Sequence, residues 1–302
     1  MQNQPKSRDP EWTIIKLLKW TTFYFKSHDI DSPRSTAEIL LAHVLKLKRI
    51  DLYLRYDQPL SLNELSKFKV LLKRRIEREP VAYIVGVKEF WSMDFAVTKE
   101  VLIPRPETEC LVEAAISLLP EHNRSDVKPA PKSILELGTG SGAVILAIAS
   151  MRPKHIYFAS DRSVEAVRLA GENSKRHGLD TTVSFFCGDW FMPLNRSKKR
   201  FDMILSNPPY VPTRMIERLQ PEIYRYEPVL ALDGDTDGLF CLRHIINTAH
   251  YYLNRNGNLL LEIGHDQKND VRSIIDQCGN YEHFVFTKDY SGYDRVVCMK
   301  KK

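Results

Sequence analysis

The chain contains the stretch Ser133-Ile134-Leu135-Glu136-Leu137-Gly138-Thr139-Gly140-Ser141-Gly142, followed directly by an apolar run over residues 143–149. Its first half is typical of a buried strand, and the run behind the glycines is typical of a helix. Glycine permits a tight turn and close approach of a ligand to the backbone. The N-terminus of the following helix offers free N–H groups to an anion. The order of strand, glycine-rich turn and helix therefore predicts an α/β fold with a ligand site at this turn.

A second apolar strand over residues 156–160 ends in Asp161. A carboxylate roughly 20 residues past the glycine turn is where a doubly wound sheet binds ribose hydroxyls. The glycine spacing differs from the G-x-G-x-x-G of dinucleotide sites, and it favours a nucleoside with an amino-acid tail over a pyrophosphate. The alternative for Asp161 is an ordinary acid in a turn at the end of a strand.

The residues Asn207-Pro208-Pro209-Tyr210 follow a third strand-like run, over residues 201–206. Neither proline has an N–H to donate, and each keeps the residue before it out of the helical region. The predicted loop is stiff and extended, and it presents one side-chain amide and unpaired backbone carbonyls. It suits binding of a planar –NH2 group, which indicates a reaction at an amide or amino nitrogen. The alternative is a structural turn, because Asn-Pro and Pro-Pro are common in loops.

With these features the chain resembles a class I methyltransferase that uses S-adenosylmethionine, which implies a Rossmann-like α/β domain. The resemblance implies that Asp161 binds the ribose, that Asp189 accepts from the adenine amino group and that Trp190 stacks on the purine. An ordinary core aromatic is the alternative for Trp190. The cofactor-binding residues implied in this way are Glu136, Gly138, Thr139, Gly140, Ser141, Gly142, Asp161, Asp189, Trp190 and Asn207.

A closer resemblance rests on the segments 80–86, 89–91, 102–109, 226–234, 237–239 and 292–297. Together they resemble the HemK/PrmC family, the N5-glutamine methyltransferases that modify peptide chain release factors. The resemblance runs from about Ser32 to Val297 and implies that the substrate is the glutamine of the Gly-Gly-Gln motif in class-1 release factors. Asp235 and Tyr293 depart from the family pattern, and both are expected to lie away from the chemistry.

The resemblance also assigns roles within the proline loop. Asn207 and the Pro208 carbonyl are expected to accept the two N–H groups of the substrate amide, and Tyr210 to pack against the amide plane. The expected catalytic residues are thus Asn207, Pro208 and Tyr210, with Pro209 added as a substrate contact. No metal is expected, because no His, Asp or Glu cluster with ligand spacing is present.

The N-terminal part differs from the rest in pattern and charge. Residues 1–79 hold 16 Lys and Arg against 10 Asp and Glu, whereas the remainder holds 28 of each sign. Apolar residues at helical spacing, Pro33 in a first turn and a capping box of Ser61 with Glu64 predict a helical bundle, which we interpret as a substrate-recognition domain. Its last helix should run to about Glu79. The densest basic cluster, expected to form a face that attracts an acidic partner, is Lys67, Lys69, Lys73, Arg74, Arg75 and Arg78.

The remaining boundaries follow from breaks in the pattern. Pro80 is expected to end the helices, and residues 80–104 to form a β-hairpin linker ahead of a methyltransferase domain over residues 105–302. A tight turn is predicted at Asn256-Gly257, before a strand over residues 259–263. The runs 283–286 and 295–299 are expected to close the sheet as an antiparallel pair.

The composition indicates a protein of the reducing cytoplasm. Five scattered cysteines without a C-x-x-C pair argue against a disulfide framework or a zinc site. No apolar run approaches 18 residues, so no membrane span is expected. We also expect a monomer that does not bind nucleic acid directly. Two alternatives stay open: an N6-adenine methyltransferase acting on DNA or RNA, in which the same loop holds a flipped base, and a non-enzymatic binding module with a degenerate cofactor domain.

Overall fold

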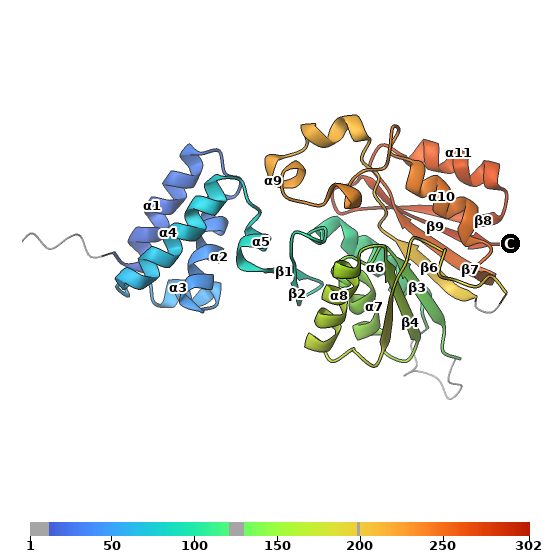
Figure 1. Ribbon diagram of the computed structural model, residues 1–302, viewed down its shortest axis with the longest axis horizontal. Coiled ribbons are helices and arrows are strands. Elements are labelled where there is room, and N and C mark those ends of the chain that lie inside the picture. The colour runs from blue at the N-terminus through green and yellow to red at the C-terminus, as the bar shows by residue number, and fades with distance from the viewer. Residues whose placement is uncertain (1–11, 121–129, 198–199) are drawn as a thin grey trace, which may run out of the picture. The chain divides into compact units, whose positions relative to one another are not determined.

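The computed structural model describes residues 12–120, 130–197 and 200–302, and it divides into two compact units, Met1–Gly86 and Val87–Lys302 (Figure 1). The predicted ranges 1–79 and 105–302 also include residues 1–11, 121–129 and 198–199, which lie outside the described residues. In the described part of the chain, no helix combines the length and the apolar character needed to cross a membrane.

The first unit is a helical bundle. Its helices are α1 (Ile14–Ser27), α2 (Pro33–Leu45), α3 (Arg49–Leu54), α4 (Leu62–Ile76) and α5 (Val81–Val85). The predicted capping box is confirmed, because Ser61 Oγ accepts from Glu64 N and the Glu64 carboxylate accepts from Ser61 N. The prediction that Pro80 ends the helices is wrong. Pro80 stands at the N-cap of α5, where its missing N–H costs nothing, and Ile84 of α5 is buried in the helical core.

The expected basic face on α4 is only partly present. Arg75 is buried, and Arg74 is bonded to Glu79 through two nitrogens at 2.7 Å. The helical period explains the difference, because consecutive basic residues point in successive directions around the helix and only some of them reach solvent. Lys67, Lys69 and Lys73 are exposed.

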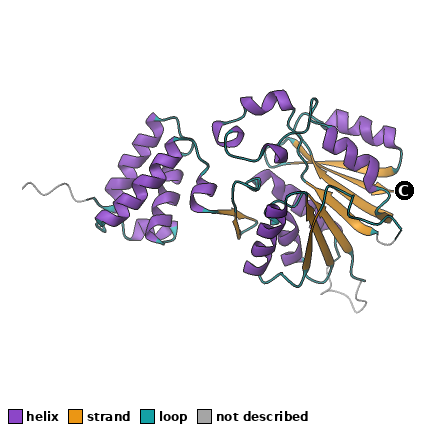
Figure 2. Cartoon of the chain, viewed as in Figure 1, coloured by secondary structure: helices purple, strands orange, loops and turns teal. Residues whose placement is uncertain are grey.

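The second unit contains one seven-stranded sheet with helices on both faces (Figure 2). Its strand order is β5-β4-β3-β6-β7-β9-β8, in which β9 runs antiparallel to both β7 and β8 and the other neighbouring pairs are parallel. The strands are β3 (Ser133–Leu137), β4 (Ile156–Asp161), β5 (Val183–Cys187), β6 (Phe201–Ser206), β7 (Leu253–Glu262), β8 (Tyr281–Lys288) and β9 (Asp294–Lys301). The predicted antiparallel closing pair is confirmed by β8 and β9.

The two faces of this sheet follow from alternation along its strands. One face packs against α6 (Glu109–Leu118) and α7 (Ala143–Met151), and the opposite face packs against α10 (Phe240–Ala249) and α11 (Lys268–Cys278) (Figure 1). The first face includes Ile134, Met203, Leu205, Leu260 and Val296. The second includes Leu135, Leu137, Ile204, Leu259, Leu261 and Val297. The central strands are thus apolar on both sides, as parallel strands between helical layers must be.

The segment Asn256-Gly257 is not the predicted tight turn between elements. It lies within β7, where the pairing with β6 shifts register between Phe201 and Met203. Asn256 takes a left-handed φ of 61°, and a Cβ on Gly257 would lie 3.0–3.2 Å from three backbone carbonyl oxygens. The Asn-Gly pair therefore makes an irregularity in a long strand rather than a hairpin.

A small hairpin of β1 (Val87–Phe90) and β2 (Met93–Ala96) occupies part of the predicted linker and belongs to the second unit. Asn173 of α8 (Val164–Arg176) is fully buried and attaches this hairpin to the glycine turn. It exchanges hydrogen bonds with the backbone of Ala96 at 2.8 and 3.0 Å and donates to the Ser141 carbonyl at 2.8 Å. The remaining elements of this unit are η1 (Pro106–Thr108), η2 (Thr213–Arg218), α9 (Pro221–Tyr224) and η3 (Val229–Ala231).

Candidate functional site

A cavity of about 580 Å³ lies where the strands β3, β4, β5 and β6 end. Its volume is in the range of sites for small organic ligands, roughly 300–1,000 Å³. The carboxyl ends of parallel strands are also where open α/β sheets bind ligands. The predicted site residues that line it are Glu136, Gly138, Thr139, Gly140, Ser141, Asp161, Asp189, Trp190, Asn207 and Pro209.

Three predicted site residues are not part of this lining: Gly142, Pro208 and Tyr210. Gly142 is the N-cap of α7, and a Cβ there would lie 3.1 Å from the Ala170 Cβ, so its role is close packing of two helices. Pro208 is buried beneath the loop. Tyr210 packs against the apolar cluster under α10 and α11.

Asp161 stabilises the glycine turn by a hydrogen bond to its backbone. Gly138, Gly140 and Gly142 have φ values of 70°, 54° and 82°, a backbone region that other residues rarely adopt. Gly140 N donates to Asp161 Oδ2 at 2.9 Å, and Ser163 N donates to Oδ1 at 3.0 Å. Apart from the adjacent residues in the chain, no atom of the described residues lies within 4 Å of a Cβ built on Gly138 or Gly140, so the turn leaves room for a ligand beside its backbone.

Glu136 lies beneath the turn and is almost fully buried. Its carboxyl accepts a hydrogen bond from the Thr139 hydroxyl. Burial, with a smaller contribution from the nearby Asp161, raises the pKa of Glu136 to about 8, although the hydrogen bond from the Thr139 hydroxyl opposes the change. A buried acid without a bonded cation can stabilise a positively charged group that enters the cavity.

The loop after β5 supplies the aromatic wall. Trp190 takes a left-handed φ of 46° and lies 6.2 Å from the His244 ring, measured between centroids. Gly188 is required beside it, because a Cβ there would lie 1.9 Å from Pro193 Cγ. Asp189 between them is exposed and lines the cavity. The arrangement offers one carboxylate and one aromatic face to a flat ring.

Asn207 stands directly after β6, and its amide orientation is defined. Its Nδ2 donates to Thr108 Oγ1 at 3.2 Å, which leaves Oδ1 as the amide's acceptor toward a ligand. The strand below is fixed by Ser206 Oγ, which donates to the Leu137 carbonyl at 2.8 Å. A side-chain oxygen at the rim of the cavity is therefore available to accept an N–H.

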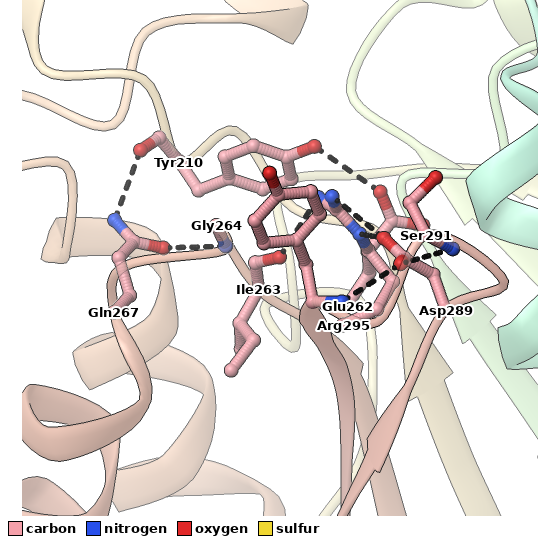
Figure 3. Close-up of polar contacts among 9 residues, drawn as sticks. Tyr210, Glu262, Ile263, Gly264, Gln267, Asp289, Ser291 and Arg295 are labelled. Atoms are coloured by element: carbon pink, nitrogen blue, oxygen red, sulfur yellow. Dashed lines mark hydrogen bonds and ion pairs between the residues drawn. The ribbon is translucent and has the colours of Figure 1, made fainter.

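Tyr210 is held at both of its polar groups (Figure 3). Its hydroxyl donates to Glu262 Oε1 at 3.2 Å, and its carbonyl accepts from Gln267 Nε2 at 3.0 Å. Burial and the neighbouring Glu262 raise the pKa of Tyr210 above its usual value, so the phenol stays protonated and donates. This contact fixes the end of the loop that begins at Asn207.

Two further segments of the cavity wall had no predicted role in the site. Residues from 100 to 108 and from 228 to 244 contribute to the lining. Glu227 joins the two segments, because its buried carboxylate forms an ion pair with Arg105 and accepts from Ile103 N at 3.2 Å. The signal for such a role was the presence of charged residues inside otherwise apolar segments.

Asp235, which was expected to lie away from the chemistry, is one of the residues that line the cavity, and it takes a left-handed φ of 71°. Within the described ranges, no group of three or more His, Cys, Asp or Glu residues has the geometry of a metal site.

Comparisons with known proteins agree with this geometry. Residues 16–86 match the family model of the PrmC N-terminal domain, which ends at the last residue of the helical unit, and residues 113–220 match the methyltransferase small domain. A release factor glutamine methyltransferase of Geobacter sulfurreducens is 41% identical over 95% of this chain and 96% of its own length. One from Rhodopirellula baltica is 36% identical over 98% of each chain.

Among solved structures, the hMettl16 catalytic domain in complex with MAT2A 3′UTR hairpin 6 matches with a TM-score of 0.54 at 13% identity. The match covers 74% of this chain and 80% of that one. At this identity the likeness concerns the fold alone, and it supports the class I methyltransferase architecture.

Proposed function

Since this chain belongs to the family of release factor glutamine methyltransferases, we propose that it methylates the side-chain amide nitrogen (N5) of a release-factor glutamine. The proposed target is the glutamine of the Gly-Gly-Gln motif in class-1 factors. The methyl donor is S-adenosylmethionine. The main support for the proposal is the orientation of the Asn207 side chain. Its Nδ2 donates a hydrogen bond to Thr108, and its Oδ1 is left to accept an N–H at the rim of the cavity.

The residues around the cavity fit S-adenosylmethionine. Asp161 and the backbone of the glycine turn would hold the ribose and the amino-acid tail, with buried Glu136 near the cationic end. Asp189 and Trp190 suit the adenine, one as an acceptor for its amino group and the other as a stacking surface. The bound cofactor would supply a methyl group on a positively charged sulfur, a strong electrophile.

The chain's task is then to prepare a poor nucleophile, because the nitrogen lone pair of an amide is delocalised into its carbonyl. Asn207 Oδ1 and the Pro208 carbonyl would accept the two N–H groups of the glutamine and fix the orientation of its nitrogen. Their partial negative charges favour the positive charge that develops on nitrogen. Positioning of this kind can supply about 7–11 kcal/mol. The methylated nitrogen would be acidic enough to release its proton to water, so no dedicated base would be required.

Incubation with labelled S-adenosylmethionine and a class-1 release factor tests this proposal. Label is expected on the wild-type factor and not on a variant in which alanine replaces the Gly-Gly-Gln glutamine. A single-stranded adenine-containing RNA in a parallel reaction serves as the competing substrate. Equal labelling of the alanine variant, or labelling of the RNA instead of the factor, would reject the proposal.

We further propose that the unit Met1–Gly86 recognises the release factor, with the exposed Lys67, Lys69 and Lys73 attracting an acidic surface. The enzyme would act as a cytoplasmic monomer that does not bind nucleic acid itself. Replacing the three lysines by glutamine should raise the KM for the factor and leave S-adenosylmethionine affinity unchanged. A KM that is unchanged and independent of salt concentration would reject this role.

A further inference from the structure

Glu262 lies beside the loop that carries Asn207, and the proposed chemistry gives it no role. It ends β7, and the parallel register that pairs Ser206 of β6 with Leu261 of β7 makes Asn207 and Glu262 neighbours at the ends of adjacent strands. The side chain is 1% exposed. Burying a carboxyl group costs free energy unless hydrogen-bond donors or charges stabilise it. The groups around Glu262 therefore indicate what its side chain does.

One end of the loop is bonded to this carboxyl group, and the other end is bonded to Thr108, which lies near it. At the far end, the Tyr210 hydroxyl donates to Glu262 Oε1 at 3.2 Å (Figure 3). At the near end, Asn207 Nδ2 donates to Thr108 Oγ1 at 3.2 Å. A hydroxyl oxygen that accepts this bond keeps a single proton of its own to give.

The carboxyl group of Glu262 is the acceptor that we assign to the proton of Thr108. Glu262 Oε2 is buried and has no hydrogen-bond partner among the described residues. The Thr108 hydroxyl is close enough to this carboxyl group to favour its ionised form. Oε2 accepts no hydrogen bond in this arrangement, and a small shift of the Thr108 side chain toward it would complete a relay from Asn207 through Thr108 to Glu262.

Arg295 provides charge near Glu262 without taking its oxygens. Two of its nitrogens donate to Asp289 Oδ2 at 3.1 Å, and a third donates to the Ile263 carbonyl at 3.3 Å. Figure 3 draws these bonds beside the contact between Tyr210 and Glu262. Both carboxyl oxygens thus remain acceptors for the hydroxyls of Thr108 and Tyr210.

We propose that Glu262 is a positioning residue for methyl transfer, which acts through Thr108 to keep the Asn207 amide oxygen directed toward the substrate. The inference rests on the proposed function. With Glu262 as the acceptor, Thr108 receives the Asn207 N–H, and the amide has one favoured orientation. Without that acceptor, the Thr108 hydroxyl can donate to Asn207 Oδ1 and stabilise the reversed amide. A reversed Asn207 would present N–H groups to the N–H groups of the glutamine, a pairing of donor with donor that leaves buried groups unsatisfied.

The test compares Thr108→Val, Thr108→Ser and Glu262→Gln with wild type. Valine has the shape of threonine without the hydroxyl, whereas serine keeps it. Thr108→Val and Glu262→Gln should lower kcat about 10- to 100-fold with little change in KM, the range for residues that orient a reacting group through a hydrogen bond. Thr108→Ser should stay near wild type. The affinity for S-adenosylmethionine, measured by calorimetry, should change less than about 2-fold, since no cofactor contact is removed.

A spectroscopic readout separates positioning from mere support of the fold. In protein labelled with ¹⁵N-asparagine, the side-chain NH2 signals of Asn207, assigned by their absence in Asn207→Ala, should shift in Thr108→Val and Glu262→Gln and stay in place in Thr108→Ser. Ser174→Ala is the matched control, because it removes a buried hydroxyl of α8 outside the cavity lining. Its kcat and its Asn207 signals should equal those of wild type.

The possible results distinguish the two proposals. A wild-type enzyme that does not label the release factor rejects the proposed function. A wild-type enzyme that labels it, together with a folded Thr108→Val that keeps wild-type kcat and unshifted Asn207 signals, rejects the role of Glu262. Loss of kcat in Thr108→Ser as large as in Thr108→Val also rejects it, because the hydroxyl would then not be the group that matters.

Discussion

Glu38 in the helical unit and the pair Glu136 and Glu262 in the catalytic unit are almost equally buried, at 2%, 2% and 1% exposure. Their partners differ. Glu38 accepts from Arg34 at 2.6 Å, from Arg49 at 2.7 Å and from a tyrosine hydroxyl of α3. Glu136 and Glu262 accept from hydroxyl groups. The comparison teaches that burial alone does not decide the charge of an acid.

The pKa values follow these partners. Burial acts to raise the pKa of Glu38, but Tyr53, Arg49 and Arg34 together bring it below its usual value. Burial raises the pKa of Glu136 to about 8 and that of Glu262 to about 7. Glu38 thus joins α2 to α3 as a stable ion, whereas the catalytic unit keeps two costly acids at the strand ends where ligands bind. Such perturbed groups are typical of functional sites.

The largest expected effect concerns the pH dependence of stability without ligand. A folded-state pKa above the unfolded value gives stability that is complete below about pH 4.5 and is lost as pH rises through about 7 for Glu262 and about 8 for Glu136. Glu38 acts in the opposite sense, and its contribution is lost as pH falls below its ordinary range. The free energy of unfolding in urea should therefore be largest near pH 4.5 and fall by several kcal/mol as the pH rises to about 8.

Glu262→Gln isolates the contribution of one acid to the pH dependence of the unfolding free energy. The variant should lose less stability than wild type between about pH 4.5 and pH 7, because glutamine does not ionise. The groups that face Glu262 and keep their charges in the variant are Arg295 and Glu107, with Tyr210 and Thr108 as neutral donors. Parallel curves for the two proteins would show that Glu262 does not titrate in this range.

The second effect is smaller and concerns Glu38. Glu38→Gln should lower the free energy of unfolding at pH 7 by about 2–3 kcal/mol, because two arginines lose their buried partner. The loss stays below the full cost of a stranded buried charge, since Arg34 and Arg49 are 36% and 53% exposed and water can reach them. Arg168→Ala, at an exposed ion pair on α8, is the control and should change stability by less than about 0.5 kcal/mol. Equal losses of unfolding free energy in Glu38→Gln and Arg168→Ala would show that the buried ion pair contributes no more than the exposed one.

The third effect separates binding from stability. Glu136→Gln should weaken S-adenosylmethionine binding about 10- to 100-fold, because a hydrogen-bonded or paired charge near a cationic ligand is worth about 1.5–3 kcal/mol. The same variant should be more stable than wild type at pH 9. Calorimetry and urea unfolding measure the two quantities, with Glu38→Gln as the control that keeps its cofactor affinity. A Glu136→Gln protein that binds as wild type does would reject the assignment of this acid to the cofactor site.

Much of the catalytic unit could be predicted from local patterns. Apolar runs gave β3, β4 and β6, and the glycine spacing with Asp161 indicated the ligand site, because these features lie close together along the chain. The capping box at Ser61 was predictable for the same reason. The local patterns at Pro80 and at Asn256-Gly257 gave wrong predictions. Proline usually ends a helix and Asn-Gly usually forms a turn, but here Pro80 precedes the helix α5 and Asn256-Gly257 lies within the strand β7, because tertiary packing outweighs the local preference.

The support of the site could not be predicted from spacing. Thr108 meets Asn207 across 99 residues, and Tyr210 meets Glu262 across 52. In the sequence, Glu262 is a single acid inside an apolar run. The hydrophobic pattern predicts that the run is buried, but it does not predict which hydrogen-bond donors surround the acid. Arg75 is an example of the opposite kind. The cluster of basic residues predicted that it would be exposed, but its position on the helix buries it.

Peptide mass spectrometry of a class-1 release factor after reaction tests the central claim most directly. With wild-type enzyme and S-adenosylmethionine, the account predicts the mass of one added methylene group on one glutamine, that of the Gly-Gly-Gln motif. With Asn207→Ala, which still has the glycine turn and Asp161 and should still bind the cofactor, the added mass should be absent. Methylation at another residue, or undiminished methylation by Asn207→Ala, would contradict the account.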